Sequence, residues 1–212
     1  MNAVPRILIL DTCTLISSVL RRGLVRLGQA GCFDVAWSTV IGDEWRRNAA
    51  RVWKISTQDV QREWECLQQA CPLADQGDVT AFKQGLEHSD PKDWHVIAAA
   101  RKAKAGAAQD CTVGIVTRNV RDFHRAELRH LGIALLDPDQ LLVRCLEAYP
   151  TQTRDMVADM PGYVRQYQER APSIVDILKR ERLFRFAKLW LAQDDAPAQT
   201  LSSPSRSSGS SP

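Results

Sequence analysis

Four short apolar runs alternate with longer stretches of helical periodicity, and this alternation is the feature that most constrains the fold. The runs "RILIL" (6–10) and "TVGIVT" (112–117) are continuous and rich in Ile, Leu and Val, which is typical of parallel strands covered on both faces. Two further short strands are predicted for "FDVAWS" (33–38) and "IALL" (133–136). Strands separated by helices pair in parallel through right-handed crossovers, so the sequence predicts an α/β protein: a three-layer α/β/α sandwich with a central parallel sheet.

Capping residues set the expected helix boundaries between these strands. Ser38 precedes one helical stretch, and Gly31 ends another. Asp137 followed by Pro138 opens the helix after the last strand. The helices expected between the strands include 15–31, 39–53 and 122–132.

The strand pattern stops near residue 148, which divides the chain into three parts. The sandwich is expected to span 5–148. Residues 150–193 show helical segments interrupted at Pro161 and Pro172, which predicts a C-terminal helical extension. The Ser- and Pro-rich end, 194–212, is expected to be a disordered tail.

Composition excludes several protein classes. The chain has 212 residues, of which 44% are hydrophobic and 25% charged, as in ordinary globular proteins. No apolar run approaches the roughly 18 residues of a membrane span, and no secretory signal precedes the first strand. The six cysteines include no C-x-x-C pair. We therefore expect a cytoplasmic protein with reduced cysteines and no membrane contact.

The stretch "HSDPKDWHVIAAA" (88–100) places Asp90 and Asp93 at the head of an apolar helix. One interpretation is structural: Asp90 is an N-cap, Pro91 occupies the first helical position, and Asp93 is a capping-box acid. The other is that both carboxylates belong to a buried functional site, since three residues place them on nearly the same helical face. The stretch alone does not decide between them.

Further acids follow the strands. Asp11 comes directly after the first strand, and Asn119 and Asp122 follow "TVGIVT". Glu44 lies in the helix after the second strand. Taken singly, Asp11 suits a turn, Glu44 a solvated helix face and Asp122 an N-cap. Sites in open parallel sheets form beyond the carboxyl ends of the strands, so their convergence at one edge favours a shared site.

Such a convergence has a chemical consequence. Two carboxylates about 4 Å apart repel by about 4 kcal/mol at an effective dielectric near 20. A group of them persists only where protons or a divalent cation neutralise the charge. Carboxylate and amide oxygens without His or Cys favour Mg2+ or Mn2+ over zinc, and such a centre suits phosphate chemistry.

Four blocks of the chain resemble, in order and spacing, the four acidic blocks of the PIN-domain nucleases. The blocks are "ILILDTCTLISSVLRR", "WSTVIGDEWRRN", "SDPKDWHVIAAARKAKA" and "GIVTRNVRDF", and the match covers residues 5–145. They look most like toxins of the virulence-associated protein C (VapC) type. The resemblance implies a parallel-sheet α/β/α fold, a Mg2+- or Mn2+-dependent endoribonuclease that hydrolyses RNA, a homodimer, and a cognate antitoxin protein as partner.

The resemblance also assigns roles to individual residues. The four catalytic acids are Asp11, Glu44, Asp93 and Asp122, with Asp11, Asp93 and Asp122 as metal ligands and Glu44 positioning a metal-bound water. Thr12 and Thr117 match small hydroxyl residues beside the first and last acids, Asp90 supports the cluster, and Asn119 stands where many members have an acid. From their charge, Arg46, Arg47, Arg118 and Arg121 are candidates to bind RNA phosphates.

Three alternatives stay open at this point. Asn119 removes one charge from the last block, which is compatible with a non-catalytic PIN-fold module that binds RNA or protein. An RNA-processing nuclease without an antitoxin would carry the same acids. A receiver-type phosphotransfer domain is the third, although it normally has paired acids after its first strands, and "ILILDTCTL" has one.

Overall fold

The computed structural model describes residues 3–164 and 172–194, and its centre is a four-stranded, all-parallel sheet. The strand order is β2-β1-β3-β4. Residues Ile7, Leu8 and Ile9 pair with Asp34, Val35 and Ala36 on one side of β1 and with Val113, Gly114 and Ile115 on the other. The strands are β1 (Ile7–Leu10), β2 (Asp34–Ala36), β3 (Val113–Val116) and β4 (Ile133–Leu136). The prediction of a parallel α/β sheet is confirmed.

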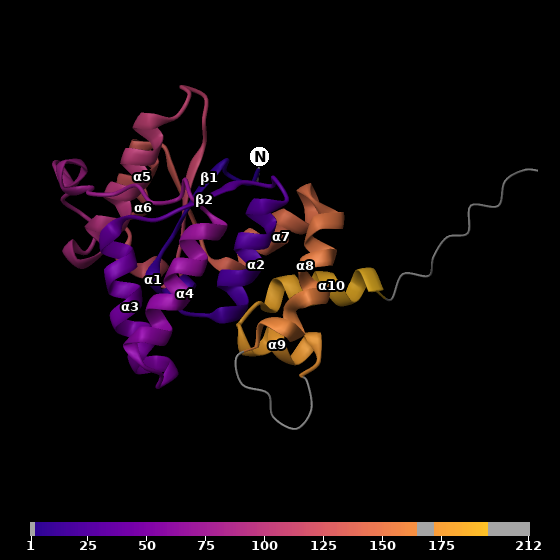
Figure 1. Cartoon of the computed structure of the whole chain (residues 1–212). Helices are drawn as coiled ribbons and strands as arrows, with labels where there is room; N and C mark the ends of the chain where they lie inside the picture. Colours follow the sequence, from indigo (N-terminus) through magenta and orange to yellow (C-terminus); the bar gives the residue numbers. More distant parts are fainter. Residues whose placement is uncertain (1–2, 165–171, 195–212) are drawn as a thin grey trace, which may run out of the picture.

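Helices cover both faces of this sheet. Figure 1 shows α5 and α6 on one side and α2 and α7 on the other, as right-handed crossovers require. Short 3-10 turns, η1 (Thr80–Lys83), η2 (Pro91–Asp93) and η3 (Val120–Asp122), precede or follow the longer elements. The helices are α1 (Thr12–Leu15), α2 (Ser18–Gln29), α3 (Thr39–Trp53), α4 (Thr57–Ala70), α5 (Trp94–Gly106), α6 (Arg125–Leu131), α7 (Pro138–Ala148), α8 (Pro150–Tyr163), α9 (Ile174–Arg180) and α10 (Phe184–Asp194).

Most capping predictions hold, and one helix is divided. Ser38 accepts a hydrogen bond from the Ile41 amide, and Asp137 forms a complete capping box with Gln140. The helix expected over 15–31 is wrong at its start. Ser17 accepts from the Leu20 amide as the N-cap of α2, so α1 ends before it and α2 begins after it.

Three tryptophans form much of the core beneath α3 and α4. Trp37, Trp45 and Trp64 are buried, and the ring centroids of Trp37 and Trp45 lie 5.5 and 5.4 Å from that of Trp64. Arg21, also buried, lies over the rings of Trp45 and Trp53. These three tryptophans are therefore packing residues of the core.

The helices after residue 148 pack on the sandwich. Helix α8 contacts α2 and α7, and α10 contacts α7. Met156, Leu178 and Phe186 are fully buried within the same apolar cluster as the sheet. The predicted disordered tail, 194–212, lies outside the described residues except for Asp194, the last residue of α10. Within the described part of the chain, no helix combines the length and apolarity that a membrane crossing requires.

Gly42 tests the packing of α3 on α4. A Cβ atom at this position would lie 2.5 Å from Cζ2 of the buried Trp64 ring, so Gly42→Ala forces two helices apart. We expect a loss of about 1–3 kcal/mol in the free energy of unfolding, measured by urea denaturation. Gly106→Ala is the matched control, because a Cβ there meets nothing within 4 Å. An equally small effect of both substitutions would contradict the packing described.

Candidate metal centre

The site lies where the strand order reverses. The chain leaves β1 toward β2 on one side, whereas β3 lies on the other, so a crevice opens beyond the carboxyl ends of β1 and β3. Asp11 follows β1, and its amide donates to the Val116 carbonyl at 3.1 Å. Thr117 follows β3, and its hydroxyl donates to Asp11 Oδ2 at 2.6 Å. The first and last acidic blocks therefore meet directly.

Three carboxylates gather at this edge, and we call them the acid cluster: Asp90, Asp93 and Asp122. One oxygen from each lies within 4.8 Å of the others. The Asp90 amide donates to the Asp122 carbonyl at 2.9 Å, which joins the start of η2 to η3. The Asn119 side-chain amide donates to the Asp122 carboxylate. Segments about 30 residues apart in the chain thus form one oxygen-rich site.

Glu127 explains how the segment before α5 returns to this edge. Its carboxylate accepts hydrogen bonds from the backbone amides of Glu87, His88 and Ser89 at 2.8, 3.2 and 3.0 Å, and from the Ser89 hydroxyl at 2.6 Å. Burial opposes the charge, but the Ser89 hydroxyl and these amides outweigh it and lower the pKa of Glu127. Glu127 therefore anchors residues 87–89 to α6, which the sequence patterns did not reveal.

Asp93 is not a capping-box residue. Helix α5 begins at Trp94, Asp93 occupies its N-cap position, and the carboxylate forms no capping hydrogen bond. Asp90 does accept from the Lys92 amide at 3.0 Å, as an N-cap of the short turn η2. Burial, followed by the charges of Asp11 and Asp122, raises the pKa of Asp93 to about 6. Asp93 is thus a partly buried carboxylate whose charge the nearby His95 offsets only in part.

Asp11 is held from two sides. Besides Thr117, the Cys13 thiol donates to Asp11 Oδ2 at 3.0 Å, and Cys13 Sγ accepts from the Arg118 amide at 3.2 Å. Burial, followed by the charge of Asp11, raises the pKa of the Cys13 thiol to about 12, so the thiol remains a donor. Sequence reasoning missed Cys13, although its position two residues after the first acid was a usable signal.

Glu44 is half-buried and joined to both neighbouring acidic blocks, so its interpretation as a solvated helix residue is wrong. Thr12 Oγ1 donates to Glu44 Oε2 at 3.0 Å, and His95 Nε2 lies 3.3 Å from the same oxygen. The nearby His95 ring lowers the pKa of Glu44, burial opposes this, and Thr12 and Arg47 add to the lowering. His95 is buried and also contacts the Lys92 carbonyl through Nδ1 at 2.7 Å.

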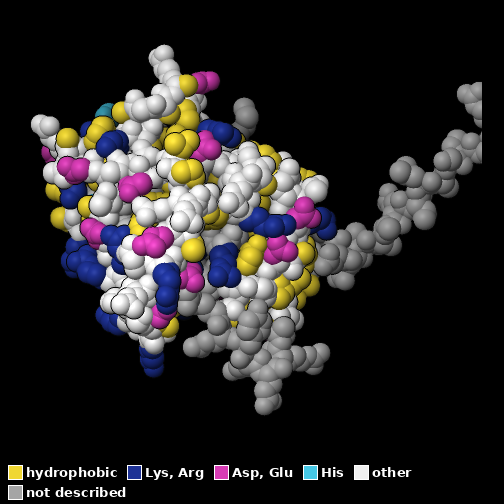
Figure 2. All heavy atoms as spheres, viewed as in Figure 1, with side chains coloured by type: hydrophobic (Ala, Val, Ile, Leu, Met, Phe, Trp, Pro, Cys, Tyr) yellow, Lys and Arg dark blue, Asp and Glu magenta, His cyan; other side chains and the backbone are white. Residues whose placement is uncertain are grey.

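The four candidate RNA-binding arginines differ in their surroundings. Arg46 pairs with Asp43 and lies over the Trp64 ring. Arg118 pairs with Glu181 of the C-terminal extension. The other two candidates, Arg47 and Arg121, are exposed. On the face seen in Figure 2, basic and acidic side chains are interspersed. The charges that bear on phosphate binding are therefore those close to the site.

The structure modifies the expected ligand set. The acid cluster contains Asp93 and Asp122 as predicted, but its third member is Asp90, which had only a supporting role. Asp11 acts on Asp93 through its charge, while its Oδ2 is occupied by two donors. The N-cap interpretation of Asp122 is wrong, because His124 caps α6. Three converging carboxylates fit a divalent cation bound through oxygen.

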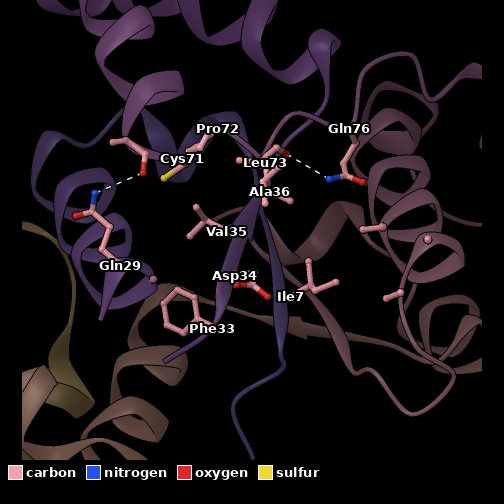
Figure 3. A pocket seen from close by; sticks show the side chains of 16 residues that line it. Ile7, Gln29, Phe33, Asp34, Val35, Ala36, Cys71, Pro72, Leu73 and Gln76 are labelled. Carbon is pink, nitrogen blue, oxygen red and sulfur yellow. Dashed lines mark hydrogen bonds between the residues drawn. The ribbon is translucent and has the colours of Figure 1, made fainter. Parts of the chain in front are cut away.

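A pocket away from this edge of the sheet is a weaker candidate for a functional site. Figure 3 shows the pocket of about 570 Å³ beside the edge strand β2, lined mostly by apolar side chains. Its two glutamines, Gln29 and Gln76, donate to the backbone carbonyls of Ala70 and Ala74. Asp34 pairs with Arg6. Its main polar side chains are thus already engaged, whereas no Lys or Arg of residues 3–164 and 172–194 forms an ion pair with the acid cluster.

Comparison with known proteins adds no assignment. No protein-family model matches the chain, and neither the curated proteins nor the solved structures contain a match. The candidate site therefore depends on its own geometry.

The raised pKa of Asp93 predicts a pH-dependent gain in stability for Asp93→Asn. The folded protein holds this proton more tightly than the unfolded chain, so ionisation costs stability as the pH rises from about 4 to about 6. Asn removes that cost. We expect Asp93→Asn to match the wild type near pH 4 and to exceed it by about 1 kcal/mol at pH 7.5, after discounting for partial exposure. Metal-free urea denaturation at both pH values measures this, and a less stable variant at pH 7.5 would contradict it.

Proposed function

We propose that this protein is a Mg2+- or Mn2+-dependent endoribonuclease of the kind that its four acidic blocks resemble, the PIN-domain nucleases. The supporting observation is the convergence of these blocks at one sheet edge. Asp11, Asp93 and Asp122 interact electrostatically, and Glu44 joins them through Thr12 and His95. Acidic residues that only formed turns, capped helices or lay in solvent would have no reason to lie close together.

The proposed mechanism assigns separate tasks to these residues. A bound divalent cation supplies charge neutralisation at the attacked phosphate and a lowered pKa for the attacking water. The acid cluster would hold the cation, and Asp11 would add negative charge beside the cluster. Glu44, with its lowered pKa, is ionised and accepts a hydrogen bond from the attacking water. Hydrolysis leaves a 5′-phosphate and a 3′-hydroxyl.

The environment of Asn119 bears on the alternative of a non-catalytic binding module. Its side-chain amide donates to the Asp122 carboxylate, and its backbone amide donates to Thr117 Oγ1 at 3.0 Å. Asn119 therefore orients the last acid instead of adding a fifth charge to the site. This arrangement favours a catalytic centre of reduced charge over a site that has lost its function.

A role as the toxin of a type II toxin–antitoxin pair is the proposed biological setting. It requires that expression of the active chain arrests growth and that a cognate antitoxin relieves the arrest. An RNA-processing nuclease would cleave RNA without arresting growth. The two settings share the same chemistry and differ only in this cellular outcome.

Metal-dependent RNA cleavage tests the proposed activity. We expect the purified protein to cut single-stranded RNA with Mg2+ or Mn2+ and to stop in EDTA. Asp93→Asn should lower the rate by about 100- to 1000-fold, because it removes charge at the reacting centre. Asp110→Asn is the matched control, since Asp110 is an exposed acid in the loop before β3.

Two results would contradict the proposal. One is cleavage that persists in EDTA or in Asp93→Asn, which would place the activity elsewhere or in a contaminant. The other is RNA binding without cleavage under any metal, which would support the binding module.

A further inference from the structure

A second pocket opens beside the acid cluster. It has a volume of about 700 Å³ and lies between the segment before η2 and the start of α6. Asp90 and Asp122 line one part of it. Arg121, Arg125 and Arg129 line another, and we call these three residues the arginine wall. The pocket therefore continues the candidate metal centre into a basic surface.

The arginine wall is not used within the protein. All three arginines are exposed, and none of their guanidinium groups forms an ion pair within residues 3–164 and 172–194. They share a pocket with two carboxylates of the acid cluster and still do not neutralise them. Arginines and carboxylates that lie side by side without pairing are suited to a ligand with two parts. Its negative groups would contact the arginines, and a cation bound to it would contact the carboxylates.

The spacing of the wall suits a chain of anions. Arg121, Arg125 and Arg129 recur every four residues, and α6 contains the last two. Four helical residues advance about 6 Å along the axis, so Arg125 and Arg129 present two guanidinium groups in a row on one face. Guanidinium groups bind phosphate oxygens in bidentate fashion.

Two histidine rings complete the pocket. His88 and His124 are exposed, and their ring centroids lie 5.1 Å apart. His124 Nδ1 accepts from the Glu127 amide at 3.3 Å, so a proton on the neutral ring lies on Nε2, where it can be donated to a ligand. Imidazole faces offer stacking surfaces for unpaired bases, which a duplex does not present.

The opposite flank of the metal centre is engaged differently. Arg118 pairs with Glu181, and Glu181 also accepts from the Ser17 hydroxyl at 2.8 Å. Arg185 lies 4.0 Å from Asp139. Arg118 and Arg185 on this flank therefore have acidic partners, whereas none of the three arginines of the arginine wall has one among the described residues.

From this asymmetry we propose that the pocket bounded by the arginine wall, His88 and His124 is a binding site for single-stranded RNA that flanks the scissile phosphate. Arg125 and Arg129 contact successive phosphates, and the histidine rings contact a base. This inference rests on the proposed nuclease function and adds the path of the substrate to it.

Binding to a fluorescein-labelled single-stranded RNA tests the site, with Asp93→Asn as the non-cleaving parent and affinity measured against salt concentration. Arg125→Gln/Arg129→Gln in this parent should bind about tenfold more weakly, with a log–log salt slope shallower by about 1.4, because each single-strand phosphate contact contributes about 0.7. Lys179→Gln/Lys188→Gln is the control with the same charge change, since both lysines are exposed on the extension. It should bind like the parent.

The other outcomes distinguish a failure of the proposed RNA-binding site from a failure of the proposed nuclease function. If both double variants bind like the parent while the wild type cleaves RNA, the arginine wall is overturned and the nuclease proposal stands. If the lysine variant alone loses affinity, the RNA follows the extension and the inference is equally overturned. If the wild type neither binds nor cleaves RNA, both proposals fail. A glutamate-rich peptide bound as tightly as RNA would indicate an acidic protein ligand and overturn the RNA site.

Discussion

Repulsion among carboxylates at the carboxyl edge of the sheet is the constraint on which the site depends. The protein relieves part of it with neutral donors. Thr117 and Cys13 donate to Asp11, Asn119 donates to Asp122, and the Lys92 amide donates to Asp90. Asp93 accepts no such hydrogen bond among the described residues, and burial, followed by the charges of Asp11 and Asp122, raises its pKa. The fold therefore keeps one acid of the cluster ready for a proton or a cation.

The sheet topology brings the first and last acidic blocks together. Parallel strands end at a common edge, and the strand order reverses between β1 and β3, which is where sites form in open parallel sheets. Asp11 and Thr117 are each the first residue after one of these strands. Their hydrogen bond fixes the distance between the first and last acidic blocks, so the sheet topology determines this part of the site.

The sequence was sufficient for features that depend on local chemistry. Apolar runs predicted the parallel strands, and Ser38 and Asp137 fixed two helix starts because capping involves neighbouring residues. It was insufficient where side chains reach across the fold. Glu127 anchors residues 87–89 from 38 to 40 positions away, and Glu181 binds Arg118 from 63 positions away. No periodicity encodes such contacts. The pairing of Arg118 with Glu181 could therefore not be predicted from the sequence, and for Asp90 the sequence indicated only a supporting place beside the cluster.

Calorimetric titration with Mn2+ at pH 7.5 measures whether a hard dication binds at the acid cluster and relieves the repulsion there. We expect saturable binding to the wild type, loss of that binding in Asp93→Asn and in Asp122→Asn, and retention in Asp110→Asn. Binding that survives both cluster substitutions, or no binding by the wild type at millimolar Mn2+, would contradict it.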